Sequence, residues 1–550
     1  MEKIREKLQT AIRELFDVEI EPEVTEAPGN IEADWSSNVA MQLAGRLHQN
    51  PMQIAEQIAT KIDLKVEILP PGFLNFISPD EYFVKEIAEI WANFDNYISC
   101  NEYSGQTAVY EFSDPNPFKV LHVGHLYTSI MGDSLAKIAE YAGSRVIRAN
   151  FGGDVGLHVA KTMWKLQQKQ SLDFTIQDVA DCYVEGTRAY EEDEQAKQEI
   201  TTLNAEIYRI NQENDHDSEL AQMYWHGREL SYKYFDDFYA RIGVKFDKYY
   251  PESSVVERGK TEVMTAFKKG IYEKSEGAIV FRGEPYGLHT RVFINREGVP
   301  TYETKDVGLI FTKWDDWHFD ESIVITGNDQ KDYMKVVLKS IEQYAPKLTE
   351  RTTHLTHGIV RLPGDEKMSS RKGNFLKAVD VLELVKDKLQ SEYGNTDETI
   401  ALGAIKYAFL KYKMGGNIIF DLDESVSMTG NSGPYLQYSC VRAKKVITKI
   451  NFDKSSQTTA LSTTLDQHER ALIKKIIQYK NTLNESVHEK APHKICNYLY
   501  ELAQEFSRFY ENCPVAGDER ETERGRIVAV FLQVMTHGLE ILGIKIPEEM

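Results

Sequence analysis

Apolar positions in the first hundred residues change from helical spacing to the alternation of short strands. Two stretches place apolar residues three or four positions apart, which predicts two amphipathic helices. Asn50 and Pro51 are typical of an N-cap and a first-turn proline, so a third helix is expected to begin there. Within residues 65–77, two apolar runs flank a Pro-Pro-Gly turn and predict two strands. We therefore expect a small α+β domain over residues 1–100.

The next part of the chain, residues 101–390, alternates between strand-like runs and helical patterns. The strand-like runs are short, apolar and partly β-branched: AVYEF (108–112), RVIRA (145–149), GAIVF (277–281), RVFIN (291–295) and SIVITG (322–327). Such alternation predicts an α/β domain built on a parallel sheet. A highly charged helical insertion is expected over about 165–255, and residues 391–550 are nearly all helical in pattern.

Composition narrows the class of protein. With 42% hydrophobic and 27% charged residues, the chain has the balance of a globular protein with a sizeable core. A net charge of −21 disfavours non-specific nucleic-acid binding, although basic residues cluster locally at 406–413 and 442–449. The 5 cysteines are scattered without a CxxC pair, so we expect a cytoplasmic protein with no structural metal. We expect no membrane association, because no apolar run is long enough to span a bilayer.

Two histidines, His122 and His125, follow the strand at 108–112 and begin the next helical pattern. A helix N-terminus favours anions, since its first N–H groups lack partners and its dipole is positive there. Gly124 has no side chain, so a flat ring can lie on the backbone while the imidazoles reach phosphate oxygens. The motif HVGH therefore favours a nucleotide site. A metal site is disfavoured because no third His or Cys is near, and two packed histidines without a function are the alternative.

A second candidate for phosphate contact is DEKMSSRKGN (365–374), a basic loop with Gly and Ser. Its cations could close on a triphosphate and neutralise the charge that develops on pyrophosphate. The sequence has no G-x-x-x-x-G-K-[ST] motif, so a P-loop enzyme is excluded.

A strand, then HVGH, then KMSS further along resembles the class I aminoacyl-tRNA synthetases. The resemblance narrows to the arginyl-tRNA synthetase family through EFSDPNPFKVLHVGHL, VIRANFGGDVG (146–156), SGPYLQYSCVRA (432–443) and the final GLEILGIKIPEEM. It implies a Rossmann-type catalytic domain over 101–390 with its KMS loop at 365–374, and a helical anticodon-binding domain over 391–550. The segments NVAMQLAGRLHQNPMQIAEQI and PPGFLNF resemble the family's additional N-terminal domain, which contacts the tRNA elbow.

This resemblance implies an ATP-dependent arginine–tRNA ligase. L-arginine and ATP would give arginyl-adenylate and pyrophosphate, and the arginyl group would pass to the 3′-terminal ribose of tRNA(Arg). Adenylate formation is expected to need bound tRNA. Magnesium is expected with ATP, through the phosphate oxygens rather than a protein cage. The family expectation for the assembly is a monomer.

The resemblance also implies roles for individual residues. The implied catalytic residues are Lys119, His122, His125 and Lys367. The implied ATP contacts are His122, Gly124, His125, Lys367, Met368, Ser369, Ser370, Arg371 and Lys372. The implied arginine contacts are Glu111, Ser113, Asn116, Tyr302, Asp306 and Gln330, with the carboxylate of Asp306 suited to a guanidinium. The implied tRNA contacts are Asn38, Phe73, Tyr435, Gln437, Tyr438 and Arg442.

Three positions depart from the family pattern. Ser370 stands where the loop usually has a lysine, and Lys119 is expected to supply that charge. Tyr127 stands where an arginine commonly follows HVGHL, and Val155 replaces a frequent tryptophan. Two other functions are kept as alternatives: a catalytically impaired synthetase-like tRNA-binding protein, and a nucleotidylyltransferase of the same superfamily.

Overall fold

The chain forms two compact units. The computed structural model describes residues 2–28, 31, 33–169, 171–361, 363, 376–452 and 464–550. The first unit comprises residues 1–97, 443–479 and 504–534, and the second comprises 98–442, 480–503 and 535–550. The consecutive domains expected at 1–100, 101–390 and 391–550 stay predictions.

Residues 1–98 contain a four-stranded antiparallel sheet in the order β1-β2-β4-β3. The elements are α1 (Glu2–Phe16), β1 (Thr25–Glu26), β2 (Trp35–Ser37), α2 (Val39–Leu47), α3 (Pro51–Lys61), β3 (Val66–Leu69), β4 (Phe73–Phe76), α4 (Asp80–Ala92) and α5 (Phe94–Ile98). Asn50 caps α3 as predicted, since its Oδ1 accepts the Met52 N–H at 2.8 Å. The predicted strand pair is also present, as β3 and β4.

An ion-pair network ties this sheet to α19 (Gln467–Ile477) within the first unit. The Arg470 guanidinium donates to Asp34 and to the Ser78 carbonyl oxygen, each at 2.7 Å, and it also pairs with Asp80. Its guanidinium carbon lies 4.3 Å from the ring centroid of Phe83. A guanidinium with this many partners joins segments about 390 positions apart in the sequence.

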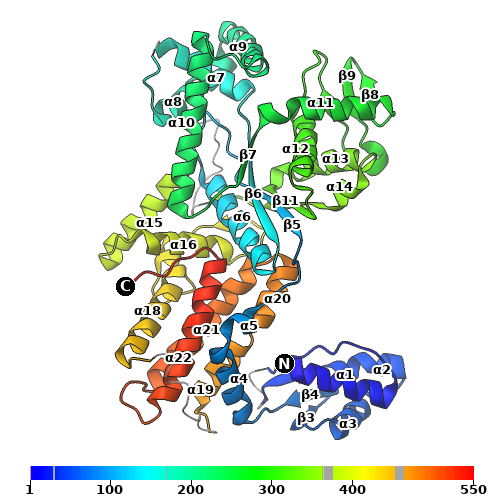
Figure 1. Cartoon of the computed structure of the whole chain (residues 1–550), viewed down its shortest axis with the longest axis vertical. Helices are drawn as coiled ribbons and strands as arrows, with labels where there is room; N and C mark the ends of the chain where they lie inside the picture. Colours follow the sequence, from blue (N-terminus) through cyan, green and yellow to red (C-terminus); the bar gives the residue numbers. More distant parts are fainter. Residues whose placement is uncertain are drawn as a thin grey trace. The chain divides into compact units, whose positions relative to one another are not determined.

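The second unit is built on a five-stranded parallel sheet in the order β12-β11-β5-β6-β7 (Figure 1). Its strands are β5 (Thr107–Glu111), β6 (Arg145–Gly152), β7 (Lys248–Pro251), β11 (Glu321–Gly327) and β12 (Thr352–His357). The predicted parallel-sheet α/β fold is confirmed. The chain passes from β5 to β6 and β7, then returns on the other side of β5 as β11 and β12. This reversal creates a switch point at the carboxyl ends of β5 and β11, where such sheets bind ligands.

Two runs expected in the parallel sheet lie elsewhere. GAIVF and RVFIN form β9 (Ala278–Phe281) and β10 (Arg291–Ile294) of a separate antiparallel sheet, with β8 (Glu273–Ser275). Glu276 and Gly277 both have positive φ and form a tight turn, so β8 and β9 can only pair antiparallel. The edges of the parallel sheet come instead from β7 and β12, whose polar sequences gave no strand signal.

Helices make up most of the chain that follows β5, as far as Ile541. They are α6 (Val123–Tyr141), α7 (Leu157–Leu166), α8 (Ile176–Glu192), α9 (Glu194–Glu213), α10 (Glu219–Ile242), α11 (Glu252–Lys268), α12 (Tyr302–Trp317), α13 (Lys331–Glu342), α14 (Pro346–Glu350), α15 (Ala378–Tyr393), α16 (Glu398–Leu410), α17 (Leu422–Val426), α18 (Gly433–Lys449), α20 (Tyr479–Glu489), α21 (Pro492–Asn512) and α22 (Glu521–Ile541). A short pair of strands, β13 (Val360–Arg361) and β14 (Ile418–Ile419), lies among them. Within the described ranges, no helix has the length and apolar character needed to cross a bilayer.

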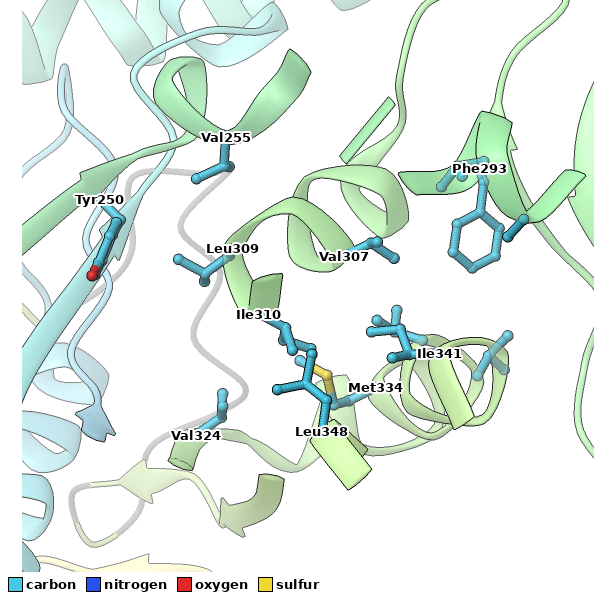
Figure 2. Packing of buried hydrophobic residues seen from close by; sticks show 14 of the residues in the cluster. Tyr250, Val255, Phe293, Val307, Leu309, Ile310, Val324, Met334, Ile341 and Leu348 are labelled. Atoms are coloured by element: carbon cyan, nitrogen blue, oxygen red, sulfur yellow. The ribbon is translucent and has the colours of Figure 1, made fainter. Parts of the chain in front are cut away.

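The helix that carries two of the expected arginine contacts, α12, is fixed by a buried apolar core (Figure 2). Leu309 and Ile310 of α12 belong to the same cluster as Val255 of α11, Val324 of β11 and Met334 of α13. Because these residues are buried, α12 is held firmly beside the switch point.

Candidate active site

The HVGH motif begins α6 with its two histidines stacked on each other. His122 is the N-cap, and its Nδ1 accepts the Gly124 N–H at 3.1 Å. The Nδ1 of His125 accepts the His122 N–H at 3.2 Å, and the ring centroids lie 3.8 Å apart. Since each Nδ1 accepts a hydrogen bond, each neutral ring carries its proton on Nε2. The pair therefore presents two N–H donors.

Both histidines are neutral at physiological pH. Burial and, after it, the nearby Lys119 ammonium lower the pKa of His122 to about 4. Burial also lowers the pKa of His125 well below its usual value, with His122 and Lys119 adding to the effect. The histidines can thus donate hydrogen bonds to phosphate oxygens without a charge of their own. Positive charge at this site comes from Lys119 and Lys377, which line the same cleft, and from the N-terminus of α6.

The histidines border an open cleft of about 270 Å³. From the motif region it is lined by Asn116, Lys119, Val120, His122 and His125, from α8 by Gln177, Ala180, Asp181, Tyr183 and Val184, and also by Lys377. Two contacts join the walls: the Lys119 ammonium lies 4.6 Å from the Tyr183 ring centroid, and Lys377 Nζ donates to Gln177 at 2.9 Å. A functionless packed pair of histidines is disfavoured by this exposure to a cleft. The part played by α8 was not visible in the sequence.

The basic loop at 365–374, with its expected contacts Lys367, Met368, Ser369, Ser370, Arg371 and Lys372, lies outside the described residues. The chain that follows it is bonded to HVGH. The Val123 N–H donates to the Leu376 carbonyl oxygen, and the Ala378 N–H donates to that of Leu121, both at 2.9 Å. Leu376 and Ala378 are thereby joined by backbone hydrogen bonds to the start of α6 and to Leu121, directly before the motif.

Three expected arginine contacts lie at the end of β5 and in the loop after it. Glu111 is buried and pairs with Lys313 of α12. The hydroxyl of Ser113 lies 2.7 Å from that of Tyr239 and 2.9 Å from that of Ser129. Asn116 Oδ1 accepts the Gly153 N–H at 2.8 Å and also lines the histidine cleft. The structure thus brings Asn116 next to the candidate nucleotide site.

The other three expected arginine contacts follow β10 and β11. Tyr302, at the start of α12, is 58% exposed, and the Lys305 ammonium lies 4.9 Å from its ring centroid. Asp306, one turn further, accepts a hydrogen bond from the Tyr333 hydroxyl. Gln330 is exposed in a short 3-10 turn, Asn328–Gln330, at the carboxyl end of β11, and its amide donates to Asp329 at 3.2 Å. Tyr302 and Asp306 share one helix face, as their spacing predicted.

Acidic side chains cluster in this part of the molecule. Glu111, Asp114, Glu252 and Asp306 interact electrostatically, and two of them have lysine partners: Glu111 pairs with Lys313, and Glu252 with Lys305 at 2.6 Å. Burial, helped by the Glu111 and Glu252 carboxylates and opposed by the hydrogen bond from Tyr333, raises the pKa of Asp306 to about 8. Burial and the Glu111 carboxylate also raise the pKa of Asp114 well above its usual value. A cationic ligand would let Asp114 and Asp306 ionise, so the site suits a guanidinium.

Sequence reasoning missed four members of this cluster: Asp114, Glu252, Lys305 and Lys313. Asp114 stands inside the quoted SDPNP stretch and could have been noted there. The two lysines gave no signal, because a lysine in a helical pattern is ordinarily expected on the surface. In the structure, Lys313 is fully buried and Lys305 nearly so.

The expected tRNA contacts differ in their exposure. On α18, Tyr438 and Arg442 are half-buried and stack with the guanidinium carbon 5.4 Å from the ring centroid, and Tyr435 packs edge-on against Tyr500. Gln437 is fully buried, and its amide donates to the carbonyl oxygens of Thr399 and Lys545. The prediction that Gln437 contacts RNA is therefore corrected: it is a packing residue whose amide joins three backbone segments.

Two expected elbow contacts lie in the first unit. Asn38 precedes α2, and its Oδ1 accepts a hydrogen bond from the Gln42 amide at 2.8 Å. Phe73 begins β4 and is 37% exposed. Both residues can be reached from solvent.

Two of the three departures from the family pattern, Tyr127 and Val155, are packing residues, and the third, Ser370, lies outside the described residues. Tyr127 is buried, with its ring edge-on to His357 and Phe409 at centroid distances of 4.8 and 5.4 Å. Val155 is fully buried in the apolar core shared by α7, α8, α9 and α10.

A parallel sheet whose switch point carries a histidine motif, followed by a helical C-terminal region, defines a class I aminoacyl-tRNA synthetase. Three family models match the chain: "tRNA synthetases class I (R), catalytic domain" over 86–422, "Arginyl tRNA synthetase N terminal domain" over 2–77 and "DALR anticodon binding domain" over 436–550. The catalytic model alone spans more than half of the chain, so the chain belongs to the arginyl-tRNA synthetase family. The family predicted from the sequence is confirmed.

Known relatives match along nearly the whole chain. An arginine–tRNA ligase of Treponema denticola is 28% identical over 527 residues, covering 90% of this chain and 88% of its own. One from Proteus mirabilis is also 28% identical, covering 94% of each chain. The structure of Thermus thermophilus arginyl-tRNA synthetase has a TM-score of 0.81 at 22% identity, with 100% of both chains covered. The fold is therefore shared along the full length.

Proposed function

We propose that this protein is an arginine–tRNA ligase that activates L-arginine with ATP and charges tRNA(Arg). The observation that carries the proposal is a carboxylate cluster beside Asn116, which itself lines the histidine cleft, in a chain of the arginyl-tRNA synthetase family. In the first step, the arginine carboxylate attacks the α-phosphate of ATP, and pyrophosphate leaves as the α–β bond breaks. In the second, the 3′-terminal ribose hydroxyl of the tRNA attacks the arginyl carbon, and AMP leaves.

The nucleophiles of both steps belong to the substrates, so the protein acts by positioning them and by stabilising charge. His122 and His125 donate their Nε2 protons to phosphate oxygens, and Gly124 seats the adenine. Lys119 supplies a positive charge beside them and takes over the charge missing at Ser370. The loop residues Lys367, Met368, Ser369, Arg371 and Lys372 hold the pyrophosphate. Magnesium enters as MgATP, bound through phosphate oxygens.

Arginine is recognised by charge and shape. Its guanidinium lies against Tyr302 and the ionised Asp306, while Glu111, Ser113 and Asn116 hold its α-ammonium and carboxylate end. A buried carboxylate that must be paired strongly rejects amino acids without a matching cation. Gln330 completes the side of the pocket at β11.

The tRNA is held at two places. The N-terminal domain, residues 1–100, contacts the elbow through Asn38 and Phe73. The helical region contacts the anticodon loop through Tyr435, Tyr438 and Arg442, whose rings and cation suit unstacked bases. The protein works as a monomer in the cytoplasm, away from membranes, and forms adenylate only with tRNA bound.

Pyrophosphate exchange into ATP tests the function. We expect exchange that needs both arginine and tRNA(Arg), followed by arginylation of the tRNA. Exchange that ignores arginine would identify a nucleotidylyltransferase instead. Binding of tRNA without exchange or charging would identify the catalytically impaired tRNA-binding alternative.

A further inference from the structure

A chain of hydrogen bonds joins the first turn of α6 to the end of β12. The Thr128 hydroxyl lies 2.8 Å from the Gly124 carbonyl oxygen and 2.7 Å from Nε2 of His357. On the other side of the ring, Nδ1 of His357 lies 2.8 Å from the Gly358 carbonyl oxygen. The chain therefore begins at the residue expected to seat adenine and ends just before β13.

The direction of these bonds follows from the charge of the ring. Burial lowers the pKa of His357, so the ring is neutral and carries one proton. A carbonyl oxygen can only accept, which places that proton on Nδ1, facing Gly358. Nε2 then faces the Thr128 hydroxyl as an acceptor, and the single proton of that hydroxyl is shared between Nε2 and the Gly124 carbonyl oxygen. His357 therefore contacts the same Thr128 hydroxyl that contacts the HVGH turn.

Packing leaves the ring little freedom. His357 is 7% exposed, and Tyr127 lies edge-on against it. Gly358 is equally confined, since a Cβ there would meet the Gly416 carbonyl oxygen at 2.1 Å. Because the ring is closely packed on both sides, a shift of β12 would move the ring and, through Thr128, the first turn of α6.

We infer that His357 is a positioning residue for the nucleotide site, which sets the place of Gly124 and the two histidines relative to β12 by holding Thr128. The inference rests on the proposed function, because it assumes that ATP binds at HVGH. Arginine contacts lie at β5, α12 and β11, so the effect of His357 falls on ATP.

Variants of His357 and Thr128 test this role. His357→Leu removes both bonds, whereas His357→Gln keeps an amide near the position of Nε2. In pyrophosphate exchange, we expect His357→Leu to raise the KM for ATP about fivefold, as for the loss of one hydrogen bond, with the KM for arginine within about twofold of the parent. His357→Gln should recover most of the loss. Thr128→Val should match His357→Leu, Thr128→Ser should resemble the parent, and the Leu–Val double variant should be no worse than either single one.

Comparison of the double variant with the single variants distinguishes a positioning role of His357 from a general effect on protein stability. Additive effects in the double variant, equal rises in both KM values, or an unchanged KM for ATP in His357→Leu would overturn the inference. The stabilisation of each folded variant by ATP, measured as a shift in Tm, gives the same comparison without turnover. If the unmodified protein shows no arginine-dependent exchange, the proposed function fails, and the Tm shifts still decide the role of His357. Should His357→Leu not fold, the Thr128 pair decides it.

Discussion

Arginine binding should depend on pH through Asp306. In the folded chain the pKa of Asp306 is about 8, whereas an unperturbed aspartate has 3.8. The carboxyl is therefore largely protonated at pH 7 when no ligand is bound. A guanidinium needs the ionised form, so binding must release a proton. The perturbation is a change of pH, together with the variant Asp306→Asn, which cannot ionise.

The size of the effect follows from the fraction of ionised carboxyl. With a pKa of about 8, roughly one molecule in thirty is ionised at pH 6.5 and about half at pH 8. The guanidinium stays protonated throughout this range. Since kcat/KM reports the free enzyme, its value for arginine should rise about fifteenfold between these pH values.

The free energy of unfolding of the ligand-free protein should fall with rising pH, whereas kcat/KM for arginine should rise. The unfolded chain ionises Asp306 near 3.8, whereas the folded chain keeps the proton up to about 8. The ligand-free fold therefore loses stability as the pH rises from 4 to 8. Arginine should offset this loss, and its stabilising shift in Tm should be larger at pH 8 than at pH 6.5.

The assay is arginine-dependent pyrophosphate exchange at a series of pH values, with saturating tRNA and MgATP. Asp306→Asn should show a flat profile and a KM for arginine at least a hundredfold higher, whereas Asp315→Asn, further along α12, should keep the parent profile. A parent profile that is flat between pH 6.5 and 8, or a rise that persists in Asp306→Asn, would refute the reasoning.

Three other predictions follow from single side chains. Lys119→Ala should lower pyrophosphate exchange by well over tenfold, with Lys119→Arg much closer to the parent. The reason is that the Lys119 ammonium, 4.6 Å from the Tyr183 ring centroid, lines the cleft and stabilises phosphate charge there. Near-normal exchange in Lys119→Ala would disprove this role. Arg470→Met should lower Tm by several degrees with the KM for arginine unchanged, since it leaves the partly buried Asp34 and Asp80 without their guanidinium partner. An unchanged melting curve would show that this ion-pair network does not stabilise the fold. Tyr438→Ala should raise the KM for tRNA about tenfold, with Tyr438→Phe near the parent, through lost stacking with a base; equal effects of both variants would exclude stacking.

Local signals predicted much of the fold. The Asn50 cap, the strand pair after it, and the central strands β5, β6 and β11 all appear where the pattern of apolar residues put them. The position of HVGH at a helix N-terminus was also readable, because a strand and a helical pattern meet there. The family followed from the same short motifs. These features depend on neighbours a few positions apart.

Partners far apart in the chain were not readable in this way. The Glu111–Lys313 pair spans 202 positions, and the bond from Thr128 to His357 spans 229. GAIVF and RVFIN looked like strands of the parallel sheet, and only the tight turn at Glu276 and Gly277 assigned them to another. The family resemblance alone predicts that Gln437 contacts RNA, whereas the fold buries its side chain completely.

The amino-acid order alone thus settled many of the elements, among them the central strands of the sheet, together with the histidine motif and the family, because each is encoded in a short window of side chains. Folding settled which carboxylates lie together in the proposed arginine pocket, which lysines pair with them, and that α8 lines the histidine cleft. The physical reason is that charge and burial depend on distance in space. A carboxylate acquires its pKa from whatever the completed fold places beside it.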